Sequence, residues 1–133
     1  MELIDQNLLN KVSDEAKGNV RLRMNYNFHT SLDAPSQRLL NAMQPGTVLP
    51  IHRHRHIAET YVVLRGSVRV LFYNDQGEVT ETAVLNPLNG VYGVNIPLGQ
   101  WHTVEVLEAD TVIFETKDGP YAPLAAEDVM QGS

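Results

Sequence analysis

Residues 46–66 of the chain, GTVLPIHRHRHIAETYVVLRG, decide the fold because they set a run of histidines between two framing glycines. Successive side chains of an extended segment point to opposite faces, so His52 and His54 are expected to share a face. Glu59 follows five positions after His54, so the chain must bend before Glu59 faces the same interior. Two imidazoles and one carboxylate brought together in this way are ligands for a divalent metal ion.

Other side chains of this stretch receive separate predictions. Arg53 and Arg55 alternate with the histidines and are expected to point outward into solvent. His56 falls inside the bend, where it is a spare ligand, a proton shuttle at the mouth of a pocket, or an exposed side chain. Tyr61 shares the face of Glu59, so we predict that it lines the site and acts with Glu59 in catalysis.

A fourth ligand is expected at His102, which follows the turn residues Pro97 and Gly99. A strand is predicted to start at this histidine, and the valines at alternate positions after it share its face. Apolar walls of this kind strengthen the electrostatics of a bound cation. His29, the fifth histidine, is expected to be a surface or loop residue, or else to lie at the rim of a pocket.

Short alternating segments separated by turn residues occupy most of the chain after residue 37. They recur about every 8–12 residues, which predicts eight or nine short strands and leaves no room for helical crossovers. The segment TVLPIH at 47–52 is one of these predicted strands. The apolar spacing of Leu8, Val12 and Ala16 predicts a short helix near the N-terminus.

These elements predict an all-β fold, a jelly-roll barrel with a short N-terminal helix. We divide the chain into a helix at 1–18, a barrel at 19–118 and a tail at 119–133. The tail has no clear period and is expected to cover a sheet edge or to be partly disordered.

Composition narrows the classes of function. The net charge of −6 argues against a general nucleic-acid binder and against an anionic membrane surface as partner. The chain has no cysteine, which excludes disulfides and thiolate metal sites. The first residues lack the basic and apolar segments of a signal peptide, and no stretch approaches the about 18 apolar residues of a membrane span, so we expect a cytoplasmic protein.

The histidine and glycine pattern resembles the cupin superfamily. The first cupin motif, G-x5-H-x-H-x3,4-E-x6-G, is matched at every position by Gly46, His52, His54, Glu59 and Gly66. The second motif, G-x5-P-x-G-x2-H-x3-N, is similar to residues 90–106, with one extra residue before Pro97 and valine in place of the final asparagine. Residues 38–42 and the run from His52 to His54 also resemble small single-domain cupin metalloproteins encoded with bacterial O-antigen polysaccharide genes.

The resemblance implies a double-stranded β-helix barrel, frequently dimeric, that holds one metal ion through His52, His54, Glu59 and His102. This ligand set accepts Fe, Mn, Ni, Co or Zn. Open positions on such an ion suit a bidentate hydroxy acid, an enediol or a sugar oxygen pair, and Fe(II) would also bind O2.

Three functions follow as hypotheses. The first is a metal-dependent enzyme of isomerase, epimerase, lyase or dioxygenase type, acting on a small oxygen-rich molecule such as a sugar or a carboxylate. The second is a metal-dependent sensing or binding protein without turnover. The third is a metal-free sugar-nucleotide epimerase with His52 or His54 as base and a tyrosine as acid, which is disfavoured because Glu59 completes a metal set.

Overall fold

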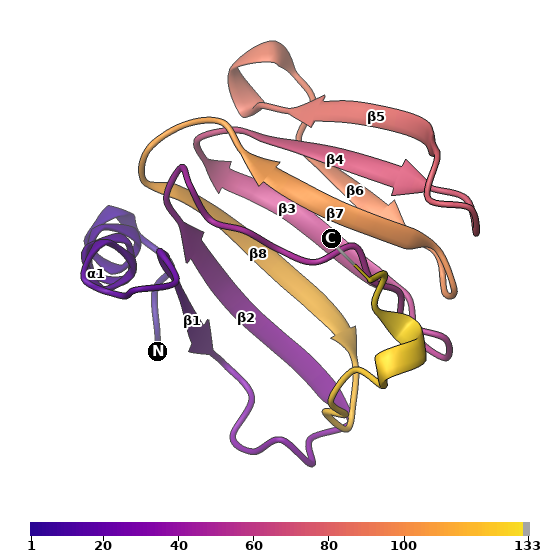
Figure 1. Cartoon of the computed structure of the whole chain (residues 1–133). Coiled ribbons are helices and arrows are strands. Elements are labelled where there is room, and N and C mark those ends of the chain that lie inside the picture. The colour runs from indigo at the N-terminus through magenta and orange to yellow at the C-terminus, as the bar shows by residue number, and fades with distance from the viewer. Residues whose placement is uncertain (132–133) are drawn as a thin grey trace.

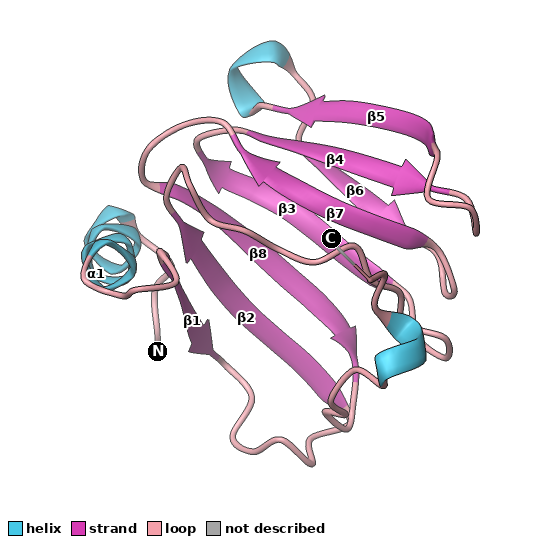
Figure 2. Cartoon of the chain, viewed as in Figure 1, coloured by secondary structure: helices cyan, strands magenta, loops and turns pink. Residues whose placement is uncertain are grey.

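The computed structural model describes residues 1–131, in which two antiparallel sheets face each other and one α-helix lies outside them (Figures 1 and 2). This arrangement confirms the predicted all-β class with a short N-terminal helix. The helical elements are α1 (Gln6–Lys17) and two 3-10 turns, η1 (Pro87–Asn89) and η2 (Ala126–Asp128). The strands are β1 (Arg23–Asn27), β2 (Ser36–Met43), β3 (Glu59–Arg65), β4 (Val68–Tyr73), β5 (Val79–Leu85), β6 (Gly93–Ile96), β7 (Trp101–Val106) and β8 (Thr111–Asp118).

The larger sheet has the strand order β1-β2-β8-β3-β6, and the smaller sheet has the order β5-β4-β7. Every neighbouring pair of these strands is antiparallel. Alternate side chains therefore point between the sheets, where they bury a shared apolar core. The buried members of this core are Met43, Tyr61, Val63, Val68, Val70, Leu85, Ile96, Val104 and Ile113.

Helix α1 covers the outer face of the larger sheet. Asp5 caps its N-terminus by accepting a hydrogen bond from the Leu8 amide at 3.0 Å. Val12 and Ala16 are fully buried, as their spacing predicted, and they pack on β2 and β8 through Leu40, Ala42 and Val112. Among the described residues, no helix combines the length and the hydropathy needed to cross a membrane.

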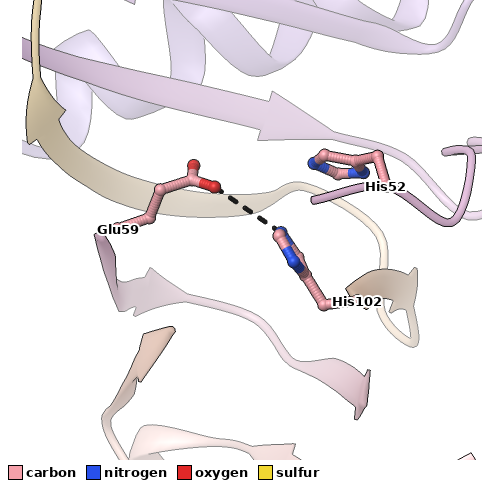
Figure 3. Close-up of side chains that lie close together, drawn as sticks. All are labelled: His52, Glu59 and His102. Carbon is pink, nitrogen blue, oxygen red and sulfur yellow. Dashed lines mark ion pairs between the residues drawn. The ribbon is translucent and has the colours of Figure 1, made fainter. Parts of the chain in front are cut away.

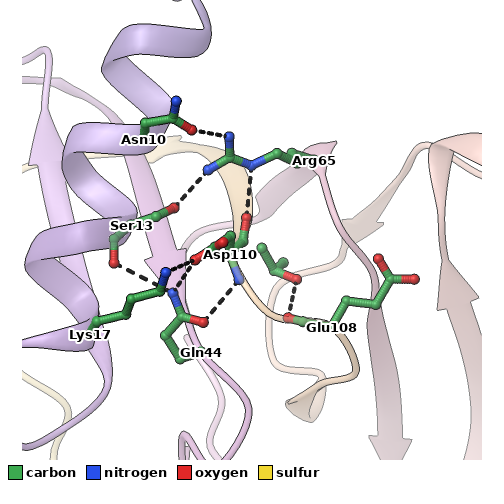
Figure 4. Close-up of polar contacts among 8 residues, drawn as sticks. Asn10, Ser13, Lys17, Gln44, Arg65, Glu108 and Asp110 are labelled. Carbon is green, nitrogen blue, oxygen red and sulfur yellow. Dashed lines mark hydrogen bonds and ion pairs between the residues drawn. The ribbon is translucent and has the colours of Figure 1, made fainter.

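Arg65, at the end of β3, ties α1 to the turn between β7 and β8 (Figure 4). Its guanidinium donates to Asn10 Oδ1 at 2.6 Å and to Ser13 Oγ at 2.9 Å. The same guanidinium donates to the carbonyl of Asp110 at 2.9 Å. Gln44 completes the cluster because its side-chain amide bonds both the carboxylate and the backbone amide of Asp110.

Residues 44–58 contain no regular strand, so the predicted strand at 47–52 is wrong. The segment instead makes an isolated antiparallel bridge between His52 and His102. Pro50 lies two residues before this bridge and has no N–H to donate to a ladder, which keeps a continuous strand from forming. The histidines therefore sit on an irregular segment held by individual backbone hydrogen bonds, among them Gly99 N–H to the His54 carbonyl at 2.7 Å and Met130 N–H to the Ile51 carbonyl at 2.9 Å.

The close packing of Gly66 against β8 yields a stability prediction. Gly66 has φ +87°, and a Cβ there would lie 2.8 Å from Thr111 Cα and closer still to its hydroxyl. We predict that Gly66→Ala lowers the free energy of unfolding by about 3 kcal/mol or more, measured by urea denaturation, because the methyl group has no room and the left-handed φ adds strain. Gly90→Ala is the matched control, since φ is +77° there but no atom lies within 4 Å of the new Cβ. It should cost about 1 kcal/mol, and equal losses in the two variants would contradict the close approach.

Candidate metal centre

Two predicted ligands, His52 and His102, are joined through their backbones. The His52 amide donates to the His102 carbonyl at 3.0 Å, and the His102 amide donates back to the His52 carbonyl at 2.9 Å. His102 belongs to β7, whereas His52 belongs to the irregular segment before β3. The bridge places the two imidazoles side by side, with ring centroids 4.3 Å apart.

Backbone carbonyls fix the orientation of both rings. His52 Nδ1 lies 2.9 Å from the Pro50 carbonyl oxygen, and His102 Nδ1 lies 2.9 Å from the Gln100 carbonyl oxygen. Because a carbonyl only accepts hydrogen bonds, each Nδ1 carries a proton and each Nε2 keeps its lone pair. Metal-ligating histidines usually have such an outer partner, which sets the tautomer and the direction of the ligand atom.

Glu59 and His54 complete the cluster. Glu59 opens β3 and is only 3 % exposed, and its Oε1 lies 3.5 Å from His102 Nε2 (Figure 3). His54 Nε2 lies 2.9 Å from the same oxygen, and its ring stands 5.2 Å from that of His52. The four predicted ligands are thus brought together. Three of them, His52, Glu59 and His102, offer ligand atoms that all lie within 4.8 Å of one another, whereas His54 joins through Glu59.

The donor atoms fit a divalent ion. Glu59 Oε1 and His102 Nε2 are buried, and neither makes a well-aligned hydrogen bond with a protein group. Leaving such atoms unsatisfied costs about 1–3 kcal/mol each. A cation bound among them would satisfy these lone pairs, and imidazole nitrogen with carboxylate oxygen is a donor set that Zn and the neighbouring first-row metals accept. His52, His54, Glu59 and His102 are the residues that could hold it.

The electrostatics keep these side chains in their ligating forms. Burial, and then the neighbouring His102, lower the pKa of His52 to about 4, so its imidazole is neutral at pH 7. Burial alone would raise the pKa of Glu59, but the imidazoles of His102 and His54 outweigh burial and hold it below its usual range. The cluster therefore offers a neutral imidazole and a charged carboxylate at neutral pH.

Tyr61 lies beside Glu59 on β3, as predicted. It is 5 % exposed, and its hydroxyl donates to Glu59 Oε2 at 3.1 Å. Burial, together with the charges of Glu115 and Glu59, raises the pKa of Tyr61 well above its usual value. The phenol therefore stays protonated and holds the Glu59 carboxylate in place, while a catalytic role for Tyr61 stays a prediction.

Glu115 is a site residue that the sequence analysis missed. It lies on β8 opposite Tyr61 in the ladder, is 8 % exposed, and accepts a hydrogen bond from Asn41 Nδ2 at 3.0 Å. Burial raises the pKa of Glu115. The available signal was the alternation of residues 111–118, which places Glu115 on the same face as the core residue Ile113.

A hollow of about 690 Å³, which we call the mouth, opens beside His54. Lys117 lines it and lies opposite Glu59 in the β3–β8 ladder. The mouth is large enough for a small ligand, since small-molecule sites usually measure about 300–1,000 Å³. One wall comes from the C-terminal tail, through Tyr121, Leu124 and Asp128 among others.

The prediction that both arginines point into solvent is wrong for Arg53, which is partly buried, whereas Arg55 is exposed as predicted. Arg53 Nε donates to Asp128 Oδ1 at 2.9 Å, and its guanidinium lies 4.4 Å from the ring centroid of Trp101. Arg55 Nε donates to the same carboxylate oxygen at 2.6 Å. Both arginines therefore fasten the C-terminal tail over the mouth, a contact between segments distant in the sequence.

The two remaining histidines differ from each other. His56 is exposed and lines the mouth, outside the buried cluster. His29 lies in the loop between β1 and β2, as predicted, but it is buried there rather than at the surface, and its Nδ1 lies 3.1 Å from both the amide and the carbonyl of Arg38.

Comparisons with known proteins agree on the architecture. A family model described as "Domain of unknown function (DUF6016)" matches residues 4–85, which is more than half of the chain. No curated protein matches the sequence.

Several solved structures resemble the fold. The capsular polysaccharide assembling protein CapF from Staphylococcus aureus is 20% identical at a TM-score of 0.61, over 74% of this chain and 27% of that chain. KdgF from Halomonas sp. is 17% identical at a TM-score of 0.59, over 75% of this chain and 82% of that chain. The cupin domain of Cnp3 from Schizosaccharomyces pombe is 11% identical at a TM-score of 0.58, over 72% and 64%. The chain spans about a quarter of the length of CapF, and these likenesses show the cupin fold.

The lowered pKa of His52 predicts a pH dependence in the metal-free protein. An unfolded histidine takes up a proton as the pH falls below about 6.5, whereas folded His52 resists protonation until about pH 4. The stability that neutral His52 contributes is present above pH 6.5 and is lost as the pH falls toward 4. In chelator-treated protein, the free energy of unfolding should therefore fall by on the order of 2 kcal/mol more between pH 6.5 and 4.5 in the parent than in His52→Gln.

The control for this measurement is His56→Gln, which removes an exposed histidine and should keep the slope of the parent. Urea denaturation at several pH values gives the three curves. An identical slope in His52→Gln and the parent would contradict burial of His52 in its neutral form.

Proposed function

The chain belongs to the DUF6016 family, and we propose that it is a cupin metalloprotein that binds one divalent metal ion through His52, His54, Glu59 and His102. In this proposal it is a metal-dependent enzyme acting on a small oxygen-rich molecule related to carbohydrates. In the same proposal residues 19–118 form the barrel, residues 1–18 are a helix added to it, and residues 119–133 are a tail of which 132 and 133 lie outside the described residues. A homodimer is part of the same proposal.

One observation carries the proposal. Glu59 Oε1 and His102 Nε2 are buried without well-aligned hydrogen bonds, while the Nδ1 atoms of His102 and His52 are already engaged by backbone carbonyls. The lone pairs of these two atoms therefore converge, together with His54 Nε2, which lies 2.9 Å from Glu59 Oε1. Convergence of acceptor atoms in an apolar barrel favours a cation over any other occupant.

The charge balance supports a site that also takes an oxygen ligand. Three neutral imidazoles and one carboxylate on a divalent ion leave a net charge of +1, and such an ion polarises a pair of ligand oxygens as a Lewis acid. Tyr61 holds the Glu59 carboxylate, and the carbonyls of Pro50 and Gln100 hold two of the imidazoles. Glu115, whose pKa is raised by burial, is a group on the inner wall that can hold or release a proton.

A carbohydrate-related ligand is supported by three points. The mouth beside His54, at about 690 Å³, has room for a sugar-sized molecule. Among the structural neighbours, CapF is described as a capsular polysaccharide assembling protein. The resemblance of residues 38–42 to cupins encoded with O-antigen genes points in the same direction, toward polysaccharide biosynthesis.

A metal-free epimerase is less compatible with the geometry. In that mechanism a tyrosine would donate a proton to the substrate. Tyr61, the tyrosine beside the cluster, already donates to Glu59.

A metal-binding protein without turnover is separated from an enzyme by incubating the metal-loaded protein with candidate sugars and hydroxy acids. Solvent deuterium incorporation or O2 uptake supports the enzyme, and its absence across these substrates with retained binding supports the sensor.

Metal content tests the ligand assignment. We predict that the parent protein, dialysed against chelator-free buffer, holds one equivalent of a divalent metal by elemental analysis. Glu59→Gln and His102→Ala should each weaken metal affinity by about a hundredfold or more, because each removes a donor, and both should still fold because the apolar core does not contain the ion. Circular dichroism checks the fold.

The matched control is His56→Ala, which removes an imidazole from the mouth and should keep its metal. Unchanged metal content in Glu59→Gln and His102→Ala would refute the ligand set. Loss of metal in His56→Ala would place that histidine among the ligands instead.

A further inference from the structure

A second polar hollow, of about 350 Å³, lies at the start of β1, away from the mouth. Strand β1 is the edge of the larger sheet, beside α1 (Figure 1). We call this hollow the arginine hollow, and its lining residues are Asn19, Arg21, Arg23, Met24, Asn25 and Asn41. It shares no lining residue with the mouth, and strands β2 and β8 separate β1 from the strand that carries Glu59.

Two guanidinium groups in this hollow have no counter-ion. Within residues 1–131, neither Arg21 nor Arg23 has a carboxylate within ion-pair distance, although the chain has a net charge of −6. Burial, and then the positive charge of Arg21, lower the pKa of Arg23, which shows that the two cations repel each other. The charge of Glu115 raises the pKa of Arg23, but burial raises the pKa of Glu115 itself and so favours the neutral carboxyl, which would not compensate the arginine. The hollow therefore carries an uncompensated positive charge.

The two arginines are held by a fixed turn. Leu22, which lies between them, adopts φ +59°, a left-handed conformation that a branched residue rarely accepts. Its carbonyl accepts hydrogen bonds from the Gln44 amide at 2.9 Å and from Thr47 Oγ1 at 3.0 Å. The Arg21 amide donates to Asn19 Oδ1 at 2.8 Å. These bonds hold the strained backbone from which both arginine side chains leave.

Asn41 adds an unmet hydrogen bond. Its Nδ2 donates to Glu115 at 3.0 Å, but its Oδ1 is buried and has no hydrogen-bond partner. Turning the amide over exchanges the two atoms, and one polar atom is left unpartnered in either orientation. Because this atom has almost no exposed surface, Asn41 forms part of the wall of the hollow and does not itself contact a ligand.

We propose that the arginine hollow binds a small anion, whose carboxylate or phosphate pairs with Arg21 and Arg23. Planar guanidinium groups bind both kinds of anion through paired, charge-assisted hydrogen bonds. Asn19 and Asn25 supply further amides around the same space. The site goes beyond the proposed metal function and does not require a metal ion.

The test is a titration of the ¹⁵N-labelled, metal-free full chain, followed by NMR. The probes are D-glucuronate for the carboxylate, D-glucose 6-phosphate and inorganic phosphate for the phosphate, and D-glucose as the neutral control. The resonances to follow are the side-chain amides of Asn25 and Asn41 and the Nε–H groups of Arg21 and Arg23. We expect at least one anion to shift them saturably and D-glucose to leave them unchanged. If only D-glucuronate binds, the ligand group is a carboxylate. If only the phosphates bind, the ligand group is a phosphate.

Two double variants distinguish specific binding in the hollow from nonspecific electrostatic attraction to the protein surface. The double variant R21Q/R23Q should weaken the anion by at least about tenfold, because it removes the charge-assisted hydrogen bonds. The control R38Q/R69Q removes the same charge elsewhere and should change the affinity by less than about twofold, since diffuse surface charge is screened by salt. If R21Q/R23Q does not fold, the single variant R21Q, which alters an exposed side chain, takes its place. Equal weakening in both double variants, or no saturable shift with any anion, would overturn the proposal.

Discussion

The pairing of His52 with His102 is the contact on which the candidate metal centre depends. Residues 44–58 belong to no regular strand, and two backbone hydrogen bonds, at 3.0 and 2.9 Å, fasten them to β7. The bridge sets His52 beside His102, and a separate hydrogen bond from the Gly99 amide to the His54 carbonyl, at 2.7 Å, holds the next histidine. The polar centre of the barrel is therefore assembled by a few backbone contacts between segments far apart in the sequence.

Burying this cluster carries an energetic cost that the fold offsets in part. The Nδ1 atoms of His52 and His102 have carbonyl partners, and Tyr61 donates to Glu59. His52 avoids a buried charge because its pKa falls to about 4. Within residues 1–131, the buried atoms Glu59 Oε1 and His102 Nε2 have no well-aligned hydrogen bond. These two atoms make a bound cation the simplest completion of the site.

The sequence pattern predicted the structural features that depend on residues close together in the chain. Period-two alternation identified the strands, and the shared face of Glu59, Tyr61 and Val63 followed from it, as their burial confirms. Pro50 was the sign that the histidine segment would not form a regular strand, and it was outweighed by the alternating pattern around it. Ion pairs between distant segments, such as Arg53 with Asp128, leave no periodic trace in a single sequence and came only from the structure. The same holds for the bond between Asn41 and Glu115, since it requires the register of β2 against β8.

Anomalous X-ray diffraction from crystals of the protein loaded with a first-row divalent metal tests the central claim most directly. Data collected on both sides of the absorption edge of the metal place the ion without reference to activity. The account predicts one strong peak in the barrel, about 2.0–2.2 Å from His52 Nε2, His102 Nε2 and a carboxylate oxygen of Glu59, with His54 as the fourth protein ligand. A barrel without a peak, in which an ordered water instead bonds Glu59 Oε1 and His102 Nε2, would contradict it.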